Sequence, residues 1–328
     1  MSNPDISDYQ AFLNAKAEKF KTSQELIDQV VEQATSEKPQ SIERLIHGEV
    51  NEVYKITTEQ GQNLILRISH ATGERYAKEK WAIEQSAEAG VPVPEIINLT
   101  TIEAEDGPRT FCLQKQIEGI PLDQIDSTLD TETKKQITIE GGSWLHKIHS
   151  VKTERYGNID DKGIGEFGTI QESLTEWSRE PERLAEIAKS VDLKEEDMTR
   201  ALRILEDIAK DYEYTESHLL HKDYSTKHFL IKDNHINGVI DFENAKAGDP
   251  IEEFARWHYY FNDEYPLEWL LEGYPDKSRI NIPEFEKLMH AWRLNFGLGV
   301  LDYYEQDNNA NGINHAKKEL MKDLEYFS

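Results

Sequence analysis

The sequence predicts an α+β protein with two lobes, an N-terminal antiparallel sheet with one helix and a mainly helical C-terminal lobe. Three predicted strands, a helix and two more strands follow one another between residues 41 and 118. Nearly every later segment has the spacing of an amphipathic helix, and the main β signal among them is a single hairpin. The 328 residues suffice for two lobes, each with its own core.

Residues 1–40 form an N-terminal extension that we predict to be helical. Thr22 and Glu25 have the spacing of a capping box. The apolar residues that follow at helical spacing are Leu26, Ile27, Val30, Val31 and Ala34. The sequence leaves open whether this extension closes over a ligand or only pads the first lobe.

Residues 41–118 form the predicted N-terminal lobe. Strands are expected at 41–46, 52–58, 62–69, 95–99 and 109–117, and a helix at 74–88. Turns are expected at Gly48 and Gly61, and Gly90 ends the helix.

Residues 119–328 form the predicted C-terminal lobe. Helices are expected at 131–150, 170–190, 195–213, 250–262, 282–305 and 312–327. Two short apolar runs, 229–231 and 238–240, are separated by the polar turn 232–235, which is the pattern of a β-hairpin.

The composition excludes some classes of partner. The chain has 37 basic and 63 acidic residues, a net charge of −26, so we expect no nucleic acid partner. A cationic or neutral substrate is easier to accommodate, although high solubility or a salty cytoplasm would explain the acidity equally well. No apolar signal or membrane-spanning stretch is seen, and we expect a cytoplasmic protein. The single cysteine, Cys112, lies in an apolar run and is expected to be a buried thiol.

Three polar residues flank the predicted hairpin. Asp223 and His228 precede its first strand, and Asp241 follows its second. The hairpin would therefore bring two carboxylates and an imidazole to one edge of a small sheet. Phosphoryl transfer needs such a set, in which one carboxylate takes the proton of the attacking hydroxyl and the other groups hold Mg²⁺ against the phosphates.

This segment resembles the aminoglycoside phosphotransferase and choline kinase family, which shares the two-lobed fold of protein kinases. His221, Asp223 and position 228 align with its catalytic loop, H-x-D-x-x-x-x-N, and Asp241 matches the metal-binding aspartate of D-F-G. The run from Gly248 to Glu253 is similar to the family's G-D-P-x-x-D segment, expected to hold the catalytic loop. The resemblance implies a protein-kinase-like fold, ATP and Mg²⁺ as cofactors, Asp223 as the catalytic residue, and His228 and Asp241 as metal ligands.

Two departures from the family pattern concern the metal site. His228 stands where the family usually has Asn, as in branches that phosphorylate aminoglycosides or macrolides. An imidazole can replace the amide as a softer ligand, which could raise tolerance for Mn²⁺. The alternative is a turn histidine packed under the hairpin. Phe242 and Glu243 follow Asp241 without the glycine of D-F-G, and we expect no regulatory switch there.

The first lobe contains the other half of the implied site. Arg67 lies on an apolar strand where kinases present a lysine to the α- and β-phosphates. Its expected partner is Glu79 on the following helix, with Glu84 and Glu88 as rivals. An ordinary strand-edge cation and a solvated helix charge are the alternatives.

Nucleotide contacts by the backbone are expected at two further places. The loop before Tyr54 has one glycine, and Gly48 and Asn51 are the candidates to reach the phosphates, although a lone glycine there also fits a plain turn. Gln114 to Ile117 would join the lobes and bind the adenine edge. The choice between ATP and GTP stays open.

Two other motifs favour structural roles. His146 and His149 lie three apart on a predicted helix, but no third metal ligand is near them in the sequence, so a core or capping role is expected. The aromatic and acidic run 257–264 would suit a cationic ligand, yet its helical spacing favours the core.

Three functions follow from the resemblance. An antibiotic kinase acting on an aminoglycoside or macrolide is slightly favoured by His228 and by the acidity. The others are a metabolic kinase for choline, ethanolamine, an amino alcohol or a sugar, and a catalytically silent nucleotide-binding scaffold. We expect a small-molecule alcohol as substrate, and the acidity of the chain would suit a cationic one. The sequence sets neither its identity nor the oligomeric state.

Overall fold

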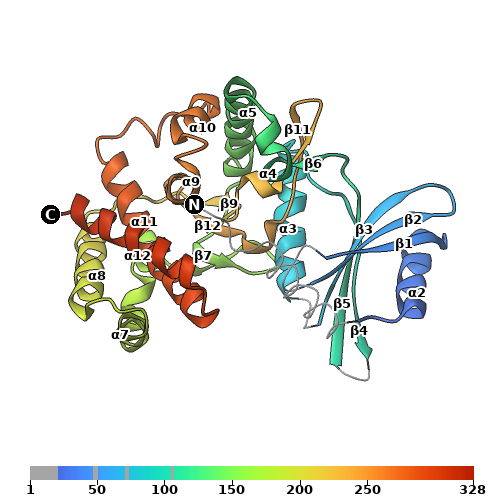
Figure 1. Ribbon diagram of the computed structural model, residues 1–328, viewed down its shortest axis with the longest axis horizontal. Helices are drawn as coiled ribbons and strands as arrows, with labels where there is room; N and C mark the ends of the chain where they lie inside the picture. Colours follow the sequence, from blue (N-terminus) through green and yellow to red (C-terminus); the bar gives the residue numbers. More distant parts are fainter. Residues whose placement is uncertain (1–20, 47–50, 71–73, 105–106) are drawn as a thin grey trace.

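The computed structural model describes residues 21–46, 51–70, 74–104 and 107–328 and has the two predicted lobes (Figure 1). The N-terminal lobe is a five-stranded antiparallel sheet in the order β1-β2-β3-β5-β4. Its elements are α2 (Gln24–Thr35), β1 (Pro39–Leu45), β2 (Glu52–Thr58), β3 (Asn63–Ser69), α3 (Glu74–Glu88), β4 (Ile96–Ala104) and β5 (Gly107–Lys115). Cys112 on β5 is buried, as predicted.

Side-chain alternation along β3 sets the two faces of this sheet. Leu64, Leu66 and Ile68 are fully buried in a core beneath α2. Arg67 has the opposite parity and therefore points to the other face, which α3 covers (Figure 1). The alternation of side chains along β3 therefore places one largely buried cation, Arg67, on the face of the sheet that α3 covers.

The N-terminal extension differs from its prediction. Ser23, and not Thr22, caps α2, because its side chain accepts the N–H of Leu26. Thr22 instead donates its backbone N–H and hydroxyl to the buried Glu52 carboxylate, at 3.1 and 2.7 Å. The helix ends at Thr35 and β1 begins at Pro39. Residues 36–40 were predicted to be helical, and they are not.

The C-terminal lobe contains the predicted hairpin among mostly helical elements. Its helices are α4 (Leu122–Ile125), α5 (Thr131–His149), α6 (Ile170–Leu174), α7 (Pro181–Ser190), α8 (Glu195–Lys210), α9 (Ile251–Phe261), α10 (Leu267–Gly273), α11 (Phe285–Gln306) and α12 (Ala310–Tyr326). Its strands are β6 (Ile120–Pro121), β7 (Tyr156–Ile159), β8 (Gly165–Phe167), β9 (His218–Leu220), β10 (Phe229–Lys232), β11 (His235–Val239) and β12 (Lys246–Gly248). They form two small sheets, β11-β10-β6 and β8-β7-β12-β9. Within the described ranges, no helix is long and apolar enough to cross a membrane.

One predicted helix, 170–190, is divided in the structure. A 3₁₀ turn, Glu176–Arg179, separates α6 from α7, and α7 begins at Pro181. Proline cannot continue a helix that started before it, because it lacks the N–H and its ring clashes with the preceding turn. The segment is therefore mostly helical, as predicted, but it consists of two helices joined by a 3₁₀ turn.

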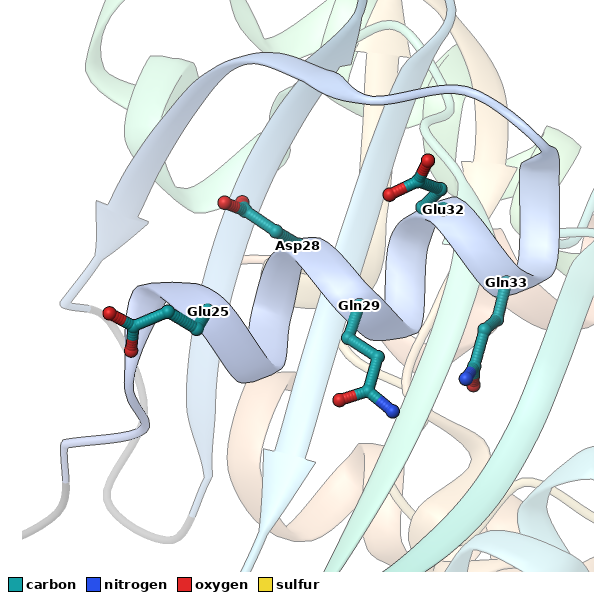
Figure 2. Close-up of a pocket in the computed structure, with 5 residues that line it drawn as sticks. All are labelled: Glu25, Asp28, Gln29, Glu32 and Gln33. Atoms are coloured by element: carbon teal, nitrogen blue, oxygen red, sulfur yellow. The ribbon is translucent and has the colours of Figure 1, made fainter.

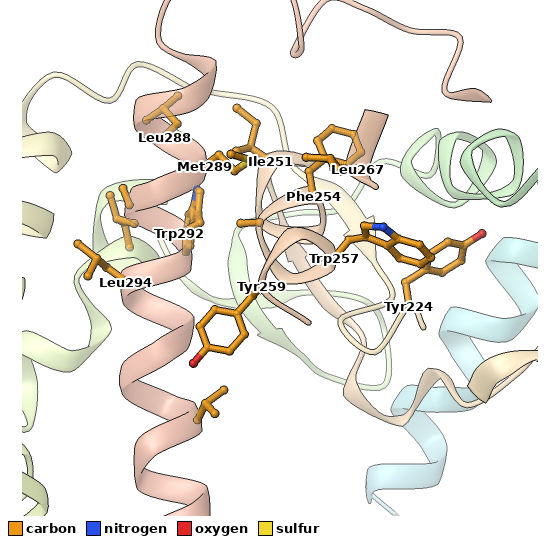
Figure 3. Packing of buried hydrophobic residues seen from close by; sticks show 14 of the residues in the cluster. Tyr224, Ile251, Phe254, Trp257, Tyr259, Leu267, Leu288, Met289, Trp292 and Leu294 are labelled. Carbon is orange, nitrogen blue, oxygen red and sulfur yellow. The ribbon is translucent and has the colours of Figure 1, made fainter. Parts of the chain in front are cut away.

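The main core of the C-terminal lobe surrounds α9. Figure 3 shows residues of α9 between α11 and the catalytic loop, with Trp257 near Tyr224 and Tyr259 facing α11. Trp257 and Tyr259 are buried, which confirms that this aromatic run serves the core. Helix α9 is consequently a rigid support behind the loop that holds Asp223.

Helix α3 is joined to the C-terminal lobe as well as to the sheet. Its Ala82 and Ile83 belong to the same core as α5 and α9 and not to the core beneath α2. Trp81 lies directly over Gly163, where an added Cβ would come within 2.1 Å of the indole ring. A side chain at position 163 would push the two lobes apart at this point.

Ion pairs between α11 and α12 yield a first prediction, on stability. Arg293 is 2% exposed and donates to Asp323 and Glu319, each at 2.8 Å. Asp323→Ala is expected to lower the free energy of unfolding by about 3 kcal/mol, because it leaves a buried guanidinium with one carboxylate partner, Glu319, in place of two. Urea unfolding measures this change. Lys322→Ala is the control, since the Lys322–Glu319 pair is more exposed and contributes only about 0–1 kcal/mol. Equal losses in both variants would contradict the prediction.

Candidate active site

The catalytic loop is fixed by a buried, neutral histidine. His221 is fully buried, and burial lowers its pKa to about 4. Its Nε2–H donates to the carbonyl of Ile240 at 3.1 Å, and its Nδ1 accepts the N–H of Asp223 at 3.2 Å. The imidazole ring also packs on Phe242, with 4.3 Å between ring centroids. His221 therefore joins the Asp223 loop to the Asp241 turn.

Two non-glycine residues of the site have left-handed backbone conformations. Lys222 has φ 59° and Asp241 has φ 71°. Such conformations are costly for residues with a Cβ and persist where the surroundings enforce them. At Lys222 the buried Glu253 carboxylate accepts the backbone N–H at 2.9 Å, which confirms that the predicted G-D-P-x-x-E segment holds the catalytic loop.

Asp223, His228 and Asp241 meet as the hairpin pattern predicted. One potential ligand atom from each lies within 4.8 Å of the others. His228 Nδ1 donates to the carbonyl oxygen of Asp223 at 2.7 Å, which leaves Nε2 as the free ring nitrogen, 3.1 Å from Asp241 Oδ2. Asp241 Oδ1 is buried without a hydrogen bond inside the described part of the chain. This donor set fits a divalent cation.

Arg67 contacts Glu79, as predicted, and reaches Asp241. Its Nη1 lies 2.5 Å from Glu79 Oε1, and its Nη2 lies 3.5 Å from Asp241 Oδ1. The rival Glu84 is exposed and pairs with Lys80. Burial raises the pKa of Asp241, but His228 and Arg67 outweigh this and hold it below its usual range. The two halves of the site are thus in direct contact.

Glu243 and Arg75 were missed by the sequence reasoning. Glu243 Oε2 lies 3.4 Å from Arg67 Nη2, and its Oε1 lies 2.5 Å from Arg75 Nη2. Arg75 and Glu79 are four apart on α3 and so share one face. The signal in the sequence was Glu243 itself, a charged residue at the position where the D-F-G motif has glycine.

Arg256 and Lys227 were also missed, although both contact Asp223. Arg256 Nη2 donates to Asp223 Oδ1, and Lys227 Nζ lies 3.3 Å from Asp223 Oδ2. Burial raises the pKa of Asp223, but Arg256, His228 and Lys227 outweigh it, so the net shift is downward. The carboxylate is therefore ionised and tightly oriented at neutral pH.

The predicted nucleotide contacts are only partly placed. Gly48 lies outside the described residues. Asn51 is the first residue of the described range 51–70, and it is half-buried. Gln114 is buried on β5, opposite Ile65 of β3. The N–H of Ile117, where the chain passes between lobes, makes no hydrogen bond to any described residue.

His149 and His146 have the structural role that was predicted. His149 is buried, and its Nδ1 lies 3.1 Å from the hydroxyl of Tyr274. His146 packs edge-on against the same ring. In the ranges that the structure covers, the one candidate metal group contains neither residue.

A separate shallow pocket lies over α2, on the outer side of the N-terminal lobe (Figures 1 and 2). The residues that line it are Glu25, Asp28, Gln29, Glu32 and Gln33. None of the groups described above lines it, so it is not part of the candidate active site.

A protein-family model and a sequence relative of known activity both match this chain. The family described as "Phosphotransferase enzyme family" matches residues 41–277. Hygromycin-B 4-O-kinase of Escherichia coli is 22% identical over 200 residues, which span 61% of this chain and 57% of that relative.

Solved structures of low sequence identity share the fold. A thermostable mutant of aminoglycoside phosphotransferase APH(4)-Ia has a TM-score of 0.73 at 18% identity, covering 92% of this chain and 99% of that one. Macrolide 2′-phosphotransferase MphH from Brachybacterium faecium has a TM-score of 0.60 at 17% identity, covering 89% and 96%. A putative fructosamine-3-kinase from Thermobifida fusca has a TM-score of 0.62 at 14% identity, covering 90% and 98%. These likenesses confirm the predicted kinase-like fold.

Proposed function

The chain belongs to the phosphotransferase enzyme family, and from that membership we propose that it transfers the γ-phosphoryl group of ATP to a hydroxyl of a small molecule. The observation that carries this proposal is the meeting of Asp223, His228 and Asp241 within reach of the Arg67–Glu79 pair. A carboxylate base, a cation site and a braced arginine are the parts that phosphoryl transfer needs.

The site residues divide the reaction between them. Asp223 orients the acceptor hydroxyl and takes its proton as the new O–P bond forms and the bond to ADP breaks. Arg67, braced by Glu79, orients the phosphates. His228 Nε2 and Asp241 would hold Mg²⁺, which when bound neutralises charge on the phosphates.

The nucleotide would lie against the N-terminal lobe. The backbone of Gln114 to Ile117 would bind the adenine edge, and the N–H of Ile117, which bonds to none of the described residues, supports this. Gly48 and Asn51 are the candidates to reach the phosphates. We propose ATP as the donor, with GTP as the second nucleotide to test, and a cytoplasmic location, where both are supplied.

For the acceptor we favour an antibiotic of the aminoglycoside or macrolide type. The sequence relative is named a hygromycin-B kinase, and one fold neighbour is named a macrolide 2′-phosphotransferase. The histidine at position 228 agrees with this branch. A metabolic sugar or amino alcohol kinase is the second candidate, since a fructosamine-3-kinase has the same fold. A silent scaffold is disfavoured because every charged part of the site is in place.

An ADP-release assay over a panel of aminoglycosides, macrolides, amino alcohols and sugars tests the proposal, with ATP and with GTP. Turnover is expected with at least one acceptor, and it should depend on added Mg²⁺. Binding of Mg·ATP without turnover of any acceptor would instead favour the scaffold.

His228 yields a second prediction, on metal preference. A ring nitrogen is a softer ligand than an amide oxygen and favours Mn²⁺ relative to Mg²⁺. His228→Asn restores the common family residue and is expected to lower the ratio of kcat with Mn²⁺ to kcat with Mg²⁺. His235→Asn, at an exposed hairpin position, is the matched control. An unchanged ratio in His228→Asn would show that the imidazole does not bind the metal.

A further inference from the structure

The side chain of Arg256, on α9, is held rigidly beside the catalytic carboxylate. It is 11% exposed, and its Nη2 donates to Asp223 Oδ1. The guanidinium carbon lies 5.3 Å from the ring centroid of Tyr260 and 5.6 Å from that of Phe296. A guanidinium packed on aromatic faces has a fixed plane, so its remaining donors point in fixed directions.

Arg256 still has unused hydrogen-bonding capacity. Its Nη1 is buried and has no hydrogen-bond partner within the part of the chain that the structure describes. A buried, unpaired donor is unfavourable until an oxygen accepts from it. Because Nη2 of the same guanidinium is bonded to Asp223, an acceptor oxygen that bonds to Nη1 would lie close to the hydroxyl that faces Asp223.

The groups around Asp223 are cationic on both sides. Arg256 Nη2 donates to Asp223 Oδ1, and Lys227 Nζ lies 3.3 Å from Asp223 Oδ2. The nearby carboxylate of Glu252 is already engaged, with Lys222 Nζ at 3.3 Å. An ammonium group next to the reacting hydroxyl would therefore lie beside two cations, Arg256 and Lys227. The one further carboxylate of the cluster, Asp241, is the proposed ligand of the metal.

Resting on the kinase activity proposed above, we propose that Arg256 determines acceptor specificity. It selects molecules that carry an oxygen, as hydroxyl, carbonyl or carboxylate, on the carbon next to the reacting hydroxyl, and it disfavours an ammonium there. In the transfer, the acceptor O–H proton passes to Asp223, the acceptor oxygen bonds to phosphorus, and ADP departs with the electrons of the broken P–O bond. Arg256 keeps all its protons and donates to the neighbouring oxygen of the acceptor.

Matched pairs of acceptors that differ only at that neighbouring group test the inference. The probe pair is 1,2-propanediol with 1-amino-2-propanol, in which the hydroxyl on C2 has an oxygen or an ammonium on the neighbouring carbon, and kcat/KM is measured for each; glucose with glucosamine is a second pair for transfer to the hydroxyl on C1 or C3. The wild-type protein is expected to prefer the oxygen member by at least about tenfold, since tenfold corresponds to only about 1.4 kcal/mol of like-charge repulsion. A preference for the amino member would overturn the inference.

Variants separate this role from a structural one. Arg256→Gln keeps a donor but removes the charge, and the preference ratio is expected to approach one while the KM for ATP stays unchanged. Arg256→Lys keeps the charge without the fork, so the ratio should persist at a lower kcat. Because the ratio is measured within each variant, partial unfolding cancels. Arg183→Gln, whose arginine pairs with Asp302 and Glu305 away from the site, is the control. An unaltered ratio in Arg256→Gln would overturn the inference.

Failure of this inference is distinguishable from failure of the proposed function. A protein that does not bind Mg·ATP and phosphorylates nothing defeats the proposed kinase activity itself. A protein that phosphorylates other acceptors of the panel but no oxygen member of the pairs, or only their amino members, overturns the role of Arg256 alone.

Discussion

Asp223→Asn is expected to lower kcat for phosphoryl transfer by about 10²–10⁴-fold, the contribution typical of a positioned general base. Asparagine keeps the size of the side chain but cannot take the proton of the acceptor. The proposed metal ligands, His228 and Asp241, and the arginine at position 67 are untouched, so Mg·ATP should still bind. Steady-state kinetics and nucleotide titration together measure this separation of turnover from binding.

The control for this variant is Asp207→Asn on α8, where the carboxylate is exposed and pairs with Lys210. Its kcat should equal that of the wild type. In the wild type, the Asp223 carboxylate pairs with Arg256 and Lys227. Thermal unfolding of both variants shows whether removing this negative charge has unfolded the Asp223→Asn protein. An undiminished kcat in a folded Asp223→Asn protein would mean that another group takes the proton.

Asp241→Asn is expected to remove the dependence of nucleotide affinity on Mg²⁺ and to lower kcat by about 10³-fold. A bound metal supplies several kcal/mol of charge stabilisation, and each 1.36 kcal/mol is a factor of ten in rate. Asparagine is the informative replacement, because it tolerates the left-handed backbone at this position, φ 71°, as aspartate does. The loss then reports the carboxylate and not a distorted turn.

Calorimetric titration with a non-hydrolysable ATP analogue, with and without Mg²⁺, measures this effect. Asp233→Asn is the matched control, since Asp233 also has a left-handed backbone, φ 52°, but lies in the turn of the hairpin. Nucleotide affinity in Mg²⁺ that is equal in Asp241→Asn and the wild type would refute the assignment of Asp241 to the metal.

The sequence predicted those parts of the site that lie on local patterns. The hairpin between β10 and β11 is signalled by two apolar runs around a polar turn, so the meeting of Asp223, His228 and Asp241 could be predicted from spacing. Helix α3 was predicted with its observed bounds, because Gly90 ends its helical pattern. Arg67 and Glu79 followed from the family resemblance.

Other contacts were invisible because they depend on packing between distant segments. Arg256 meets a carboxylate 33 residues away, and Arg75 meets Glu243 across 168 residues. No local periodicity encodes such distances. Strands β8, β9 and β12 have three residues each, which is too short for an alternating pattern to show. The cap of α2 was displaced by one residue because Thr22 and Ser23 both have capping side chains.

The position of α3 between two cores links nucleotide affinity to the population of closed molecules. The helix is anchored in the C-terminal lobe through Ala82, Ile83 and the Trp81–Gly163 contact, whereas Arg67 belongs to the sheet. Any rotation of the sheet away from that lobe lengthens the Arg67–Glu79 contact. A molecule opened in this way would lack the braced arginine, so the proposed affinity for ATP would scale with the closed fraction. Surface substitutions that bias this equilibrium would change ATP affinity without touching a single ligand-binding atom.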